Sequence, residues 1–123
     1  MTKTISIENK DRGIEEPLRI KYCDSFLTQL RGFTLRPSLA RDEGLVLVGS
    51  RDSRLESSIH MLFVSFDLAV IWINSQMQIV DRVLAKSWRP AYFSKQPAKY
   101  VLEVHPARWD EFQIGDTVHF KNA

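Results

Sequence analysis

The chain has 123 residues, 44% of them hydrophobic, and its 17 Lys and Arg against 15 Asp and Glu leave a formal net charge of +2. A chain of this length builds one globular domain, and so small a charge excludes strong electrostatic attraction to nucleic acid or an anionic membrane. The single cysteine, Cys23, excludes an internal disulfide and a thiolate pair for structural zinc.

No apolar stretch is as long as a secretory signal or a membrane-spanning helix requires. We therefore expect a soluble, cytoplasmic protein without a membrane partner. Residues 1–17 are charged and end in Glu-Glu-Pro, which predicts an N-terminal arm, or an edge strand at Thr4–Ile7, where no function is expected. Residues 18–123 are expected to form a single globular β-rich domain.

The globular part begins with a strand and a short helix. Leu18–Tyr22 alternates apolar and basic residues, as a half-exposed strand does. Asp24 or Ser25 can cap a helix that runs through Leu30. Gly32 fits the position just after that helix, where a left-handed backbone is needed, and an ordered loop should follow to residue 39.

The remainder of the chain predicts strands joined by turns at Asn74-Ser75 and Gly115-Asp116. The predicted strands are Leu45–Val48, two strands within Ser58–Ile73 with a bend near Ser65, Met77–Ala85, Tyr100–Val104 and Thr117–Phe120. No segment shows long helical periodicity. The predicted fold class is mainly β (α+β): a compact single-domain barrel or strongly curved sheet with one or two short helices.

The motifs of common enzyme classes are missing from the sequence. There is no glycine-rich phosphate loop and no Gly-x-Ser-x-Gly nucleophile turn. The three histidines, His60, His105 and His119, share no metal-type spacing. We therefore assign no catalytic residue, no metal and no cofactor, and we do not expect a nucleic-acid partner because the arginines form no one-sided basic stripe.

Several short motifs together suggest a family. In chain order they are Arg31-Gly32-Phe33-Thr34-Leu35-Arg36, Gly44-Leu45-Val46-Leu47, Ile59-His60-Met61-Leu62-Phe63-Val64-Ser65-Phe66, Ser87-Trp88-Arg89-Pro90, Val101-Leu102-Glu103 and Gly115-Asp116. Their order and spacing over residues 27–120 resemble domain-of-unknown-function family 192, a group of small prokaryotic proteins. The resemblance implies a compact, mainly β single domain and no established activity.

The chain departs from the family pattern at two points. After Phe66 the family usually continues Pro-Ile-Asp or Pro-Leu-Asp, whereas this chain has Asp67-Leu68-Ala69, so that Ala69 stands in place of the acid. The glycine that often follows the Leu-Glu pair is also missing. A role that depends on that acid is therefore not expected here.

The polar residues of these motifs are the candidate site, because a polar side chain within an apolar strand is costly unless it is satisfied. Strand alternation places Glu103 on one face with Val101 and His105. One interpretation is structural: Glu103 pairs with an arginine and fixes loops to the sheet. The other is a pocket for a small polar or anionic ligand. The candidate ligand-binding residues are Arg31, Arg36, His60, Trp88, Arg89 and Glu103.

Three functions are therefore compared, of which a nucleic-acid binder is the least favoured. The favoured one is a non-enzymatic module that binds a small polar or anionic ligand or a protein partner. The alternative is a small hydrolase or lyase that uses Glu103 with His60 or His105 as acid and base. The sequence leaves the ligand, the pathway and the oligomeric state open.

Overall fold

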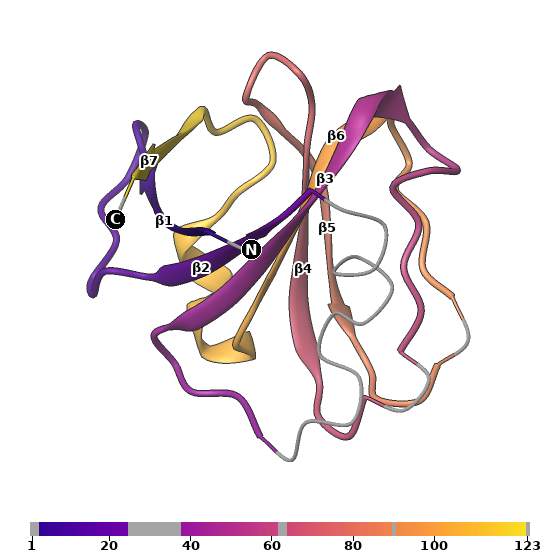
Figure 1. Ribbon diagram of the computed structural model, residues 1–123, viewed down its shortest axis with the longest axis horizontal. Helices are drawn as coiled ribbons and strands as arrows, with labels where there is room; N and C mark the ends of the chain where they lie inside the picture. The colour runs from indigo at the N-terminus through magenta and orange to yellow at the C-terminus, as the bar shows by residue number, and fades with distance from the viewer. Residues whose placement is uncertain (1–2, 25–37, 62–63, 90, 123) are drawn as a thin grey trace.

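A computed structural model of the chain describes residues 3–24, 38–61, 64–89 and 91–122. Within these residues it contains a single sheet of seven strands and one short 3-10 helix (Figure 1). In chain order the elements are β1 (Lys3–Asn9), β2 (Arg19–Cys23), β3 (Glu43–Ser53), β4 (Leu68–Ile73), β5 (Ile79–Ala85), β6 (Ala98–Val104), η1 (Pro106–Glu111) and β7 (Val118–Asn122).

The strands follow the order β5-β4-β6-β3-β2-β1-β7 across the sheet. The β2–β3 pair is parallel and the other neighbours are antiparallel. The edge strands β5 and β7 approach each other at one corner, where Gln78 and Thr117 form an isolated bridge and the Ile79 N–H donates to the Asp116 carbonyl at 2.9 Å. The sheet is thus strongly curved but is not closed into a barrel. Of the two predicted forms, the curved sheet is the correct one.

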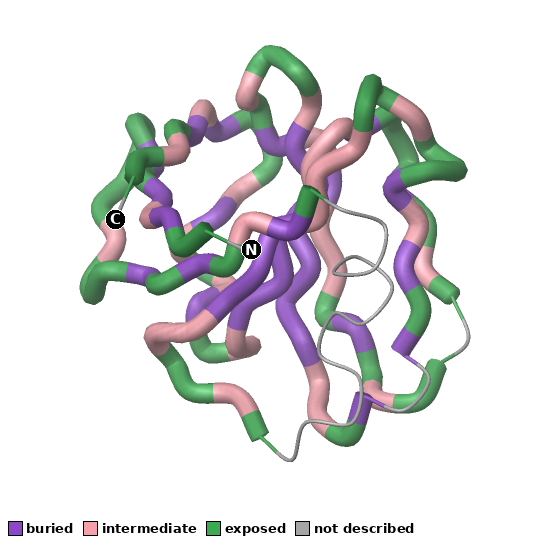
Figure 2. Tube along the Cα trace, viewed as in Figure 1, coloured by how far each residue is buried: buried purple, intermediate pink, exposed green. Residues whose placement is uncertain are grey.

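Each face of the sheet carries its own apolar cluster, and the buried chain is concentrated along the central strands (Figure 2). The first cluster contains residues of β1, β2 and β7 together with Val46, Leu102 and Phe112. The second, which we call the Trp72 cluster, contains Cys23, Leu45, Ile59, Met61, Val64, Leu68, Val70, Trp72, Ala85, Ala98 and Val101. The central strands β4 and β6 contribute alternate residues to both clusters, which explains their nearly unbroken apolar sequences.

The predicted strands are found, with three differences. β1 pairs with both β2 and β7, so Thr4–Ile7 belongs to an interior strand and not to an edge. β3 extends past Val48 to Ser53 through an irregular register, because its polar end still pairs with Ala98. In the segment before β4, the described residues make one bridge, Ile59–Tyr92, and belong to no named strand; the apolar residues among them pack on the Trp72 cluster.

One element was missed and another lies outside the described residues. η1 begins with Pro106, and His105 caps it by accepting a hydrogen bond from the Ala107 N–H at 3.0 Å. The short helix expected from Asp24 or Ser25 to Leu30 falls on residues that the structure does not describe beyond Asp24. In the described parts of the chain no helix is both long and apolar enough to cross a bilayer.

Candidate functional site

Glu103 occupies the middle of the sheet. It lies on β6 opposite Leu45 of β3 on one side and Val70 of β4 on the other. Paired residues of neighbouring strands project to the same face, so Glu103 shares its face with the Trp72 cluster, to which both neighbours belong. Only 6% of Glu103 is exposed.

The apolar surroundings determine the protonation of this carboxyl group. Burial raises the pKa of Glu103 to about 8, against 4.5 for an ordinary glutamate. Glu103 is therefore mostly protonated at neutral pH and can both donate and accept a hydrogen bond. Among the residues that the structure describes, none forms a hydrogen bond or an ion pair with its carboxyl group.

The sequence suggested that an arginine pairs with Glu103, and one of the three arginines named lies within the described residues. Arg31 and Arg36 lie outside the described residues. Arg89 is described, is exposed, and makes no ion pair with Glu103. Arg89 therefore does not neutralise Glu103, and the structural interpretation is wrong for this arginine.

Three other candidate residues, His60, Trp88 and Arg89, lie on two loops joined by their backbones. The Met61 N–H donates to the Arg89 carbonyl at 2.9 Å, and the Trp88 N–H donates to the Met61 carbonyl at 2.9 Å. Met61 itself is 1% exposed and belongs to the Trp72 cluster, so both loops are anchored to the face that holds Glu103. His60 and Arg89 are exposed at this junction.

Trp88 has an unusual conformation and position. Its φ is 66°, in the left-handed region that a bulky residue seldom adopts, and 53% of it is exposed. The carboxylate of Asp67 holds the same loop, because it accepts hydrogen bonds from the Ser87 N–H at 2.9 Å and from Lys86 Nζ at 3.4 Å. Both hydrogen bonds lower the pKa of Asp67, and the bond from the Ser87 N–H has the largest effect. The loop therefore exposes a large aromatic side chain next to its backbone contact with Met61.

His105, predicted as a face neighbour of Glu103, has a structural task. It follows the last residue of β6, and its Nδ1 caps η1. Trp109 and Phe112, in and directly after this helix, pack on the first cluster, which lies on the face opposite to Glu103. No hydrogen bond links Glu103 to His60 or His105 in the part of the chain that the structure describes.

Sequence reasoning missed two polar centres that hold the other side of the molecule together. Arg108, 1% exposed, donates to both carboxylate oxygens of Glu111 and to the carbonyls of Arg41 and Glu16. Asp116 accepts from Asn9, Arg12 and Gln113. Glu111 and Gln113 lie three residues from Arg108 and Asp116, respectively, but the other partners come from distant parts of the chain, so a local sequence pattern indicates only a fraction of each centre. Clusters of three metal-ligating side chains are not found within the described ranges.

Ala69, at the position where the family resemblance implies an acid, is fully buried on β4. It belongs to the first cluster and so lies on the face opposite to Glu103. An acid at this position would therefore not share the face on which Glu103 lies. With alanine at this position, the side chain contributes only a methyl group to the core.

Comparison with known proteins confirms the family resemblance. A family model described as DUF192, uncharacterized ACR, matches residues 7–120. The chain belongs to this family. A UPF0127 protein of Thermococcus kodakarensis is 35% identical over 114 residues, which cover 91% of this chain and 71% of that protein. A UPF0127 protein of Thermococcus sibiricus is 33% identical over 115 residues, covering 92% and 73% respectively.

Two crystal structures share the fold of this DUF192 protein. One is a Sinorhizobium meliloti protein with the provisional description of transcription regulator; it has a TM-score of 0.82 and 17% identity over 98% of this chain and 94% of that one. The other is a protein of unknown function from Novosphingobium aromaticivorans, with a TM-score of 0.79 and 16% identity over 96% and 84% of the two chains. At such identities the likeness concerns the fold alone.

Proposed function

We propose that this DUF192 protein is a non-enzymatic module that binds a small polar ligand on the Glu103 face of the sheet. The observation that carries the proposal is the placement of one carboxyl group among Leu45, Val70 and the rest of the Trp72 cluster, without a hydrogen-bond partner among the described residues. Since no fully buried side-chain polar atom of the described residues lacks a partner, the carboxyl oxygens keep the small solvent access through which a ligand reaches them. Such a group is costly to bury unless something supplies its hydrogen bonds. A bound ligand would do so.

The surrounding loops support a polar ligand with a flat apolar part. The half-exposed ring of Trp88 offers a surface for stacking, and the neighbouring Arg89 and His60 add polar groups at the rim. A protonated carboxyl group donates one hydrogen bond and accepts another, which matches the C=O and N–H of a neutral amide. An ionised ligand is less well matched to a neutral partner.

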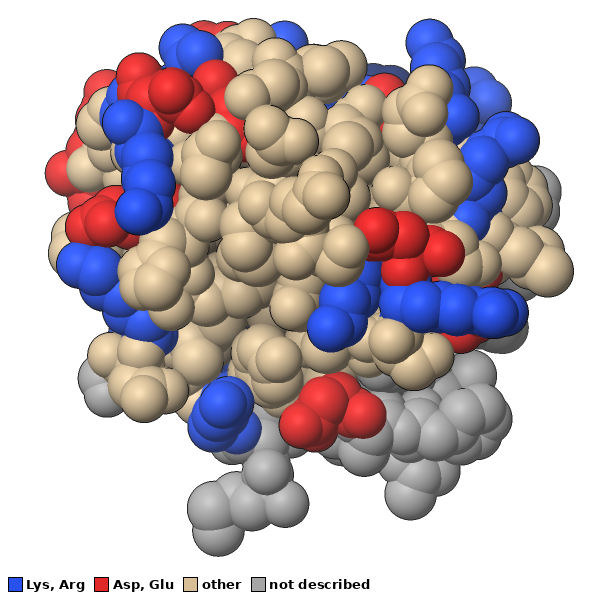
Figure 3. Space-filling view, turned by 90° about the horizontal axis from the view of Figure 1, so that it is seen from above, with Lys and Arg blue, Asp and Glu red and all other residues tan. Residues whose placement is uncertain are grey.

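Neither competing function gains support from a specific contact. The acid–base alternative requires Glu103 to act with His60 or His105, and the described residues contain no hydrogen bond between them. For a nucleic-acid partner, the face in Figure 3 shows basic and acidic side chains interleaved around an uncharged area, with no one-signed stripe on that face.

The experiment uses three probes with the same ring and different head groups: benzamide, benzoate and benzylammonium. Binding to the full chain is measured at pH 6.5 by ligand-observed NMR. We expect benzamide to bind best, and Glu103→Leu to weaken that binding at least about tenfold, because the variant keeps an apolar core but loses the carboxyl group. Trp88→Ala should weaken all three probes a few-fold.

The control variant is Asp110→Asn, which removes an exposed carboxylate from the helix on the opposite side of the sheet. It should bind like the unmodified chain. A preference for benzoate would support an anionic ligand instead. Equal binding by the Glu103→Leu variant and the unmodified chain would contradict the proposal.

A further inference from the structure

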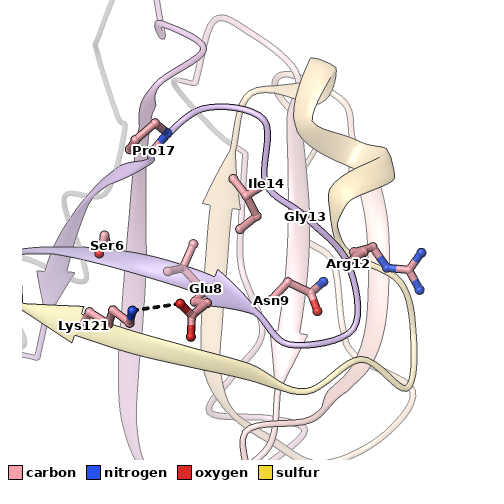
Figure 4. Close-up of a pocket in the computed structure, with 9 residues that line it drawn as sticks. Ser6, Glu8, Asn9, Arg12, Gly13, Ile14, Pro17 and Lys121 are labelled. Carbon is pink, nitrogen blue, oxygen red and sulfur yellow. Dashed lines mark ion pairs between the residues drawn. The ribbon is translucent and has the colours of Figure 1, made fainter.

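A cavity of about 350 Å³ lies between β1, the end of β7 and the connection from β1 to β2 (Figure 4). Its volume is within the range of small-molecule sites. The residues that line it are Ser6, Ile7, Glu8, Asn9, Arg12, Gly13, Ile14, Pro17 and Lys121. It belongs to a different part of the sheet from Glu103, which is on β6 and does not line it.

The cavity exists because two neighbouring strands separate. β1 and β2 pair only as far as Ile5 and Ile20. Beyond that point β1 continues beside β7 to Asn9, while the chain arcs away and returns through Pro17. The second half of β1 therefore has a strand on one side only, and the cavity occupies the other side.

The backbone of Ile7 points toward this open side. The Lys10 N–H donates to the Thr117 carbonyl at 2.9 Å, so even-numbered residues of this strand direct their polar backbone groups toward β7. In a strand these groups alternate, and those of Ile7 must therefore point the other way. The same alternation is visible from β7. Val118 lies opposite Asn9, an odd-numbered residue, and its N–H bonds to the Met77 carbonyl and not to β1.

Nothing in the described chain uses the polar groups of Ile7 on that side. No loop backbone or side chain among the described residues forms a hydrogen bond with its N–H or C=O. Pro17, across the cavity, has no N–H to offer. A strand edge with an unused N–H and C=O is a site for a further extended segment.

The charges of the lining favour an uncharged ligand. Lys121 Nζ pairs with the Glu8 carboxylate at 2.8 Å, as the dashed line in Figure 4 marks, and Arg12 is bound to Asp116 through two hydrogen bonds. The charged groups of the lining are thus already paired. The apolar side chain of Ile14 projects into the space between them and packs on the first cluster.

We propose that this cavity binds a small neutral ligand that carries a peptide-like unit, whose N–H and C=O pair with the C=O and N–H of Ile7. The apolar substituent of that unit lies against Ile14 and Pro17. The ligand adds one residue of strand where β2 has separated from β1. This site is independent of the Glu103 site.

The probe is N-acetyl-L-valinamide, titrated into the 15N-labelled full chain and followed by amide NMR shifts. We expect saturable shifts centred on Ile7, Gly13 and Ile14. The analogue in which an ester oxygen replaces the valine N–H should bind about fivefold more weakly, because it cannot donate to the Ile7 carbonyl. This comparison changes only the ligand and does not depend on the folding of a variant.

Two protein variants test the location. Ser6→Trp adds bulk to the cavity wall and should abolish the shifts, whereas Thr4→Trp, on the same face of β1 but outside the cavity, should leave them unchanged. Glu103→Leu should also leave them unchanged, which separates this result from the proposed function. Absence of saturable shifts at Ile7, or equal affinity for the ester analogue, would overturn the proposal.

Discussion

The protonation of Glu103 has a measurable consequence for stability. The pKa of Glu103 in the fold is about 8, above the 4.5 of the unfolded chain, so between these values the folded state holds a proton that the unfolded state has lost. Stability attributable to this group is fully present below pH 4.5 and is lost as the pH rises through 8. At 1.36 kcal/mol per pKa unit the full loss is about 5 kcal/mol.

Glu103→Gln removes this titration and keeps the size of the side chain. Relative to the unmodified chain, the variant should gain little or nothing at pH 4, about 3 kcal/mol at pH 7 and about 5 kcal/mol at pH 9 in the free energy of unfolding. Against a typical domain stability of about 5–15 kcal/mol this is a large effect. Urea unfolding at a series of pH values measures it, with Asp110→Asn as the control.

The opposite slope would refute this reasoning. If Glu103→Gln becomes increasingly destabilising as the pH rises above 5, the carboxyl group is ionised in the fold and pairs with a cation, as the structural interpretation of the sequence allowed. The 13C shift of the Glu103 carboxyl carbon reports its protonation directly. A titration midpoint below pH 5 would likewise show that the group is ionised in the fold.

Two further predictions concern the polar centres on the other side of the molecule. Arg108→Met should lower the free energy of unfolding in urea at pH 7 by about 3–5 kcal/mol, because it leaves the Glu111 carboxylate and two backbone carbonyls without their donor. Replacing Glu111 by Met in the same chain should recover part of this loss. A cost of Arg108→Met below about 1 kcal/mol would contradict this explanation. The pKa of Asp116 is held well below its usual range, chiefly by Arg12, so its contribution is present at neutral pH and is lost as the pH falls below about 4. Asp116→Asn should cost about 2 kcal/mol at pH 7 and clearly less at pH 2, where part of the ionic contribution is already lost, and equal costs at the two pH values would exclude the ionic explanation.

The sequence predicted strands best where alternation or a continuous apolar run reflects burial on the sheet. β4 and most of β6 were recognisable because their residues face two apolar clusters. The same apolar signal was misleading for the segment around Met61, since a loop packed on the Trp72 cluster has the composition of a strand without its pairing. Composition reports burial and does not report which backbone groups are paired.

The placement of the site residues was predictable only in part. Alternation along β6 put Glu103 on one face with Val101, and the structure shows that face to be apolar. The end of that strand was not predictable in the same way: His105 leaves the alternation because Pro106 begins a helix that needs a cap. A pattern that holds within a strand gives no information about the first residue after it.

Strand pairing also explains why polar groups without a hydrogen-bond partner among the described residues occur at two separate places in this small fold. At Glu103 the strand is paired on both sides, and the group without a described partner is a side chain among the apolar residues of three strands. At Ile7 the side chain is buried in the first cluster, and the groups without a described partner belong to the backbone, because β2 has already turned away. In the two proposals, the first site selects a ligand by the chemistry of one carboxyl group and the second by the spacing of a peptide unit. A single ligand therefore has no reason to fit both, and loss of one binding activity should leave the other intact.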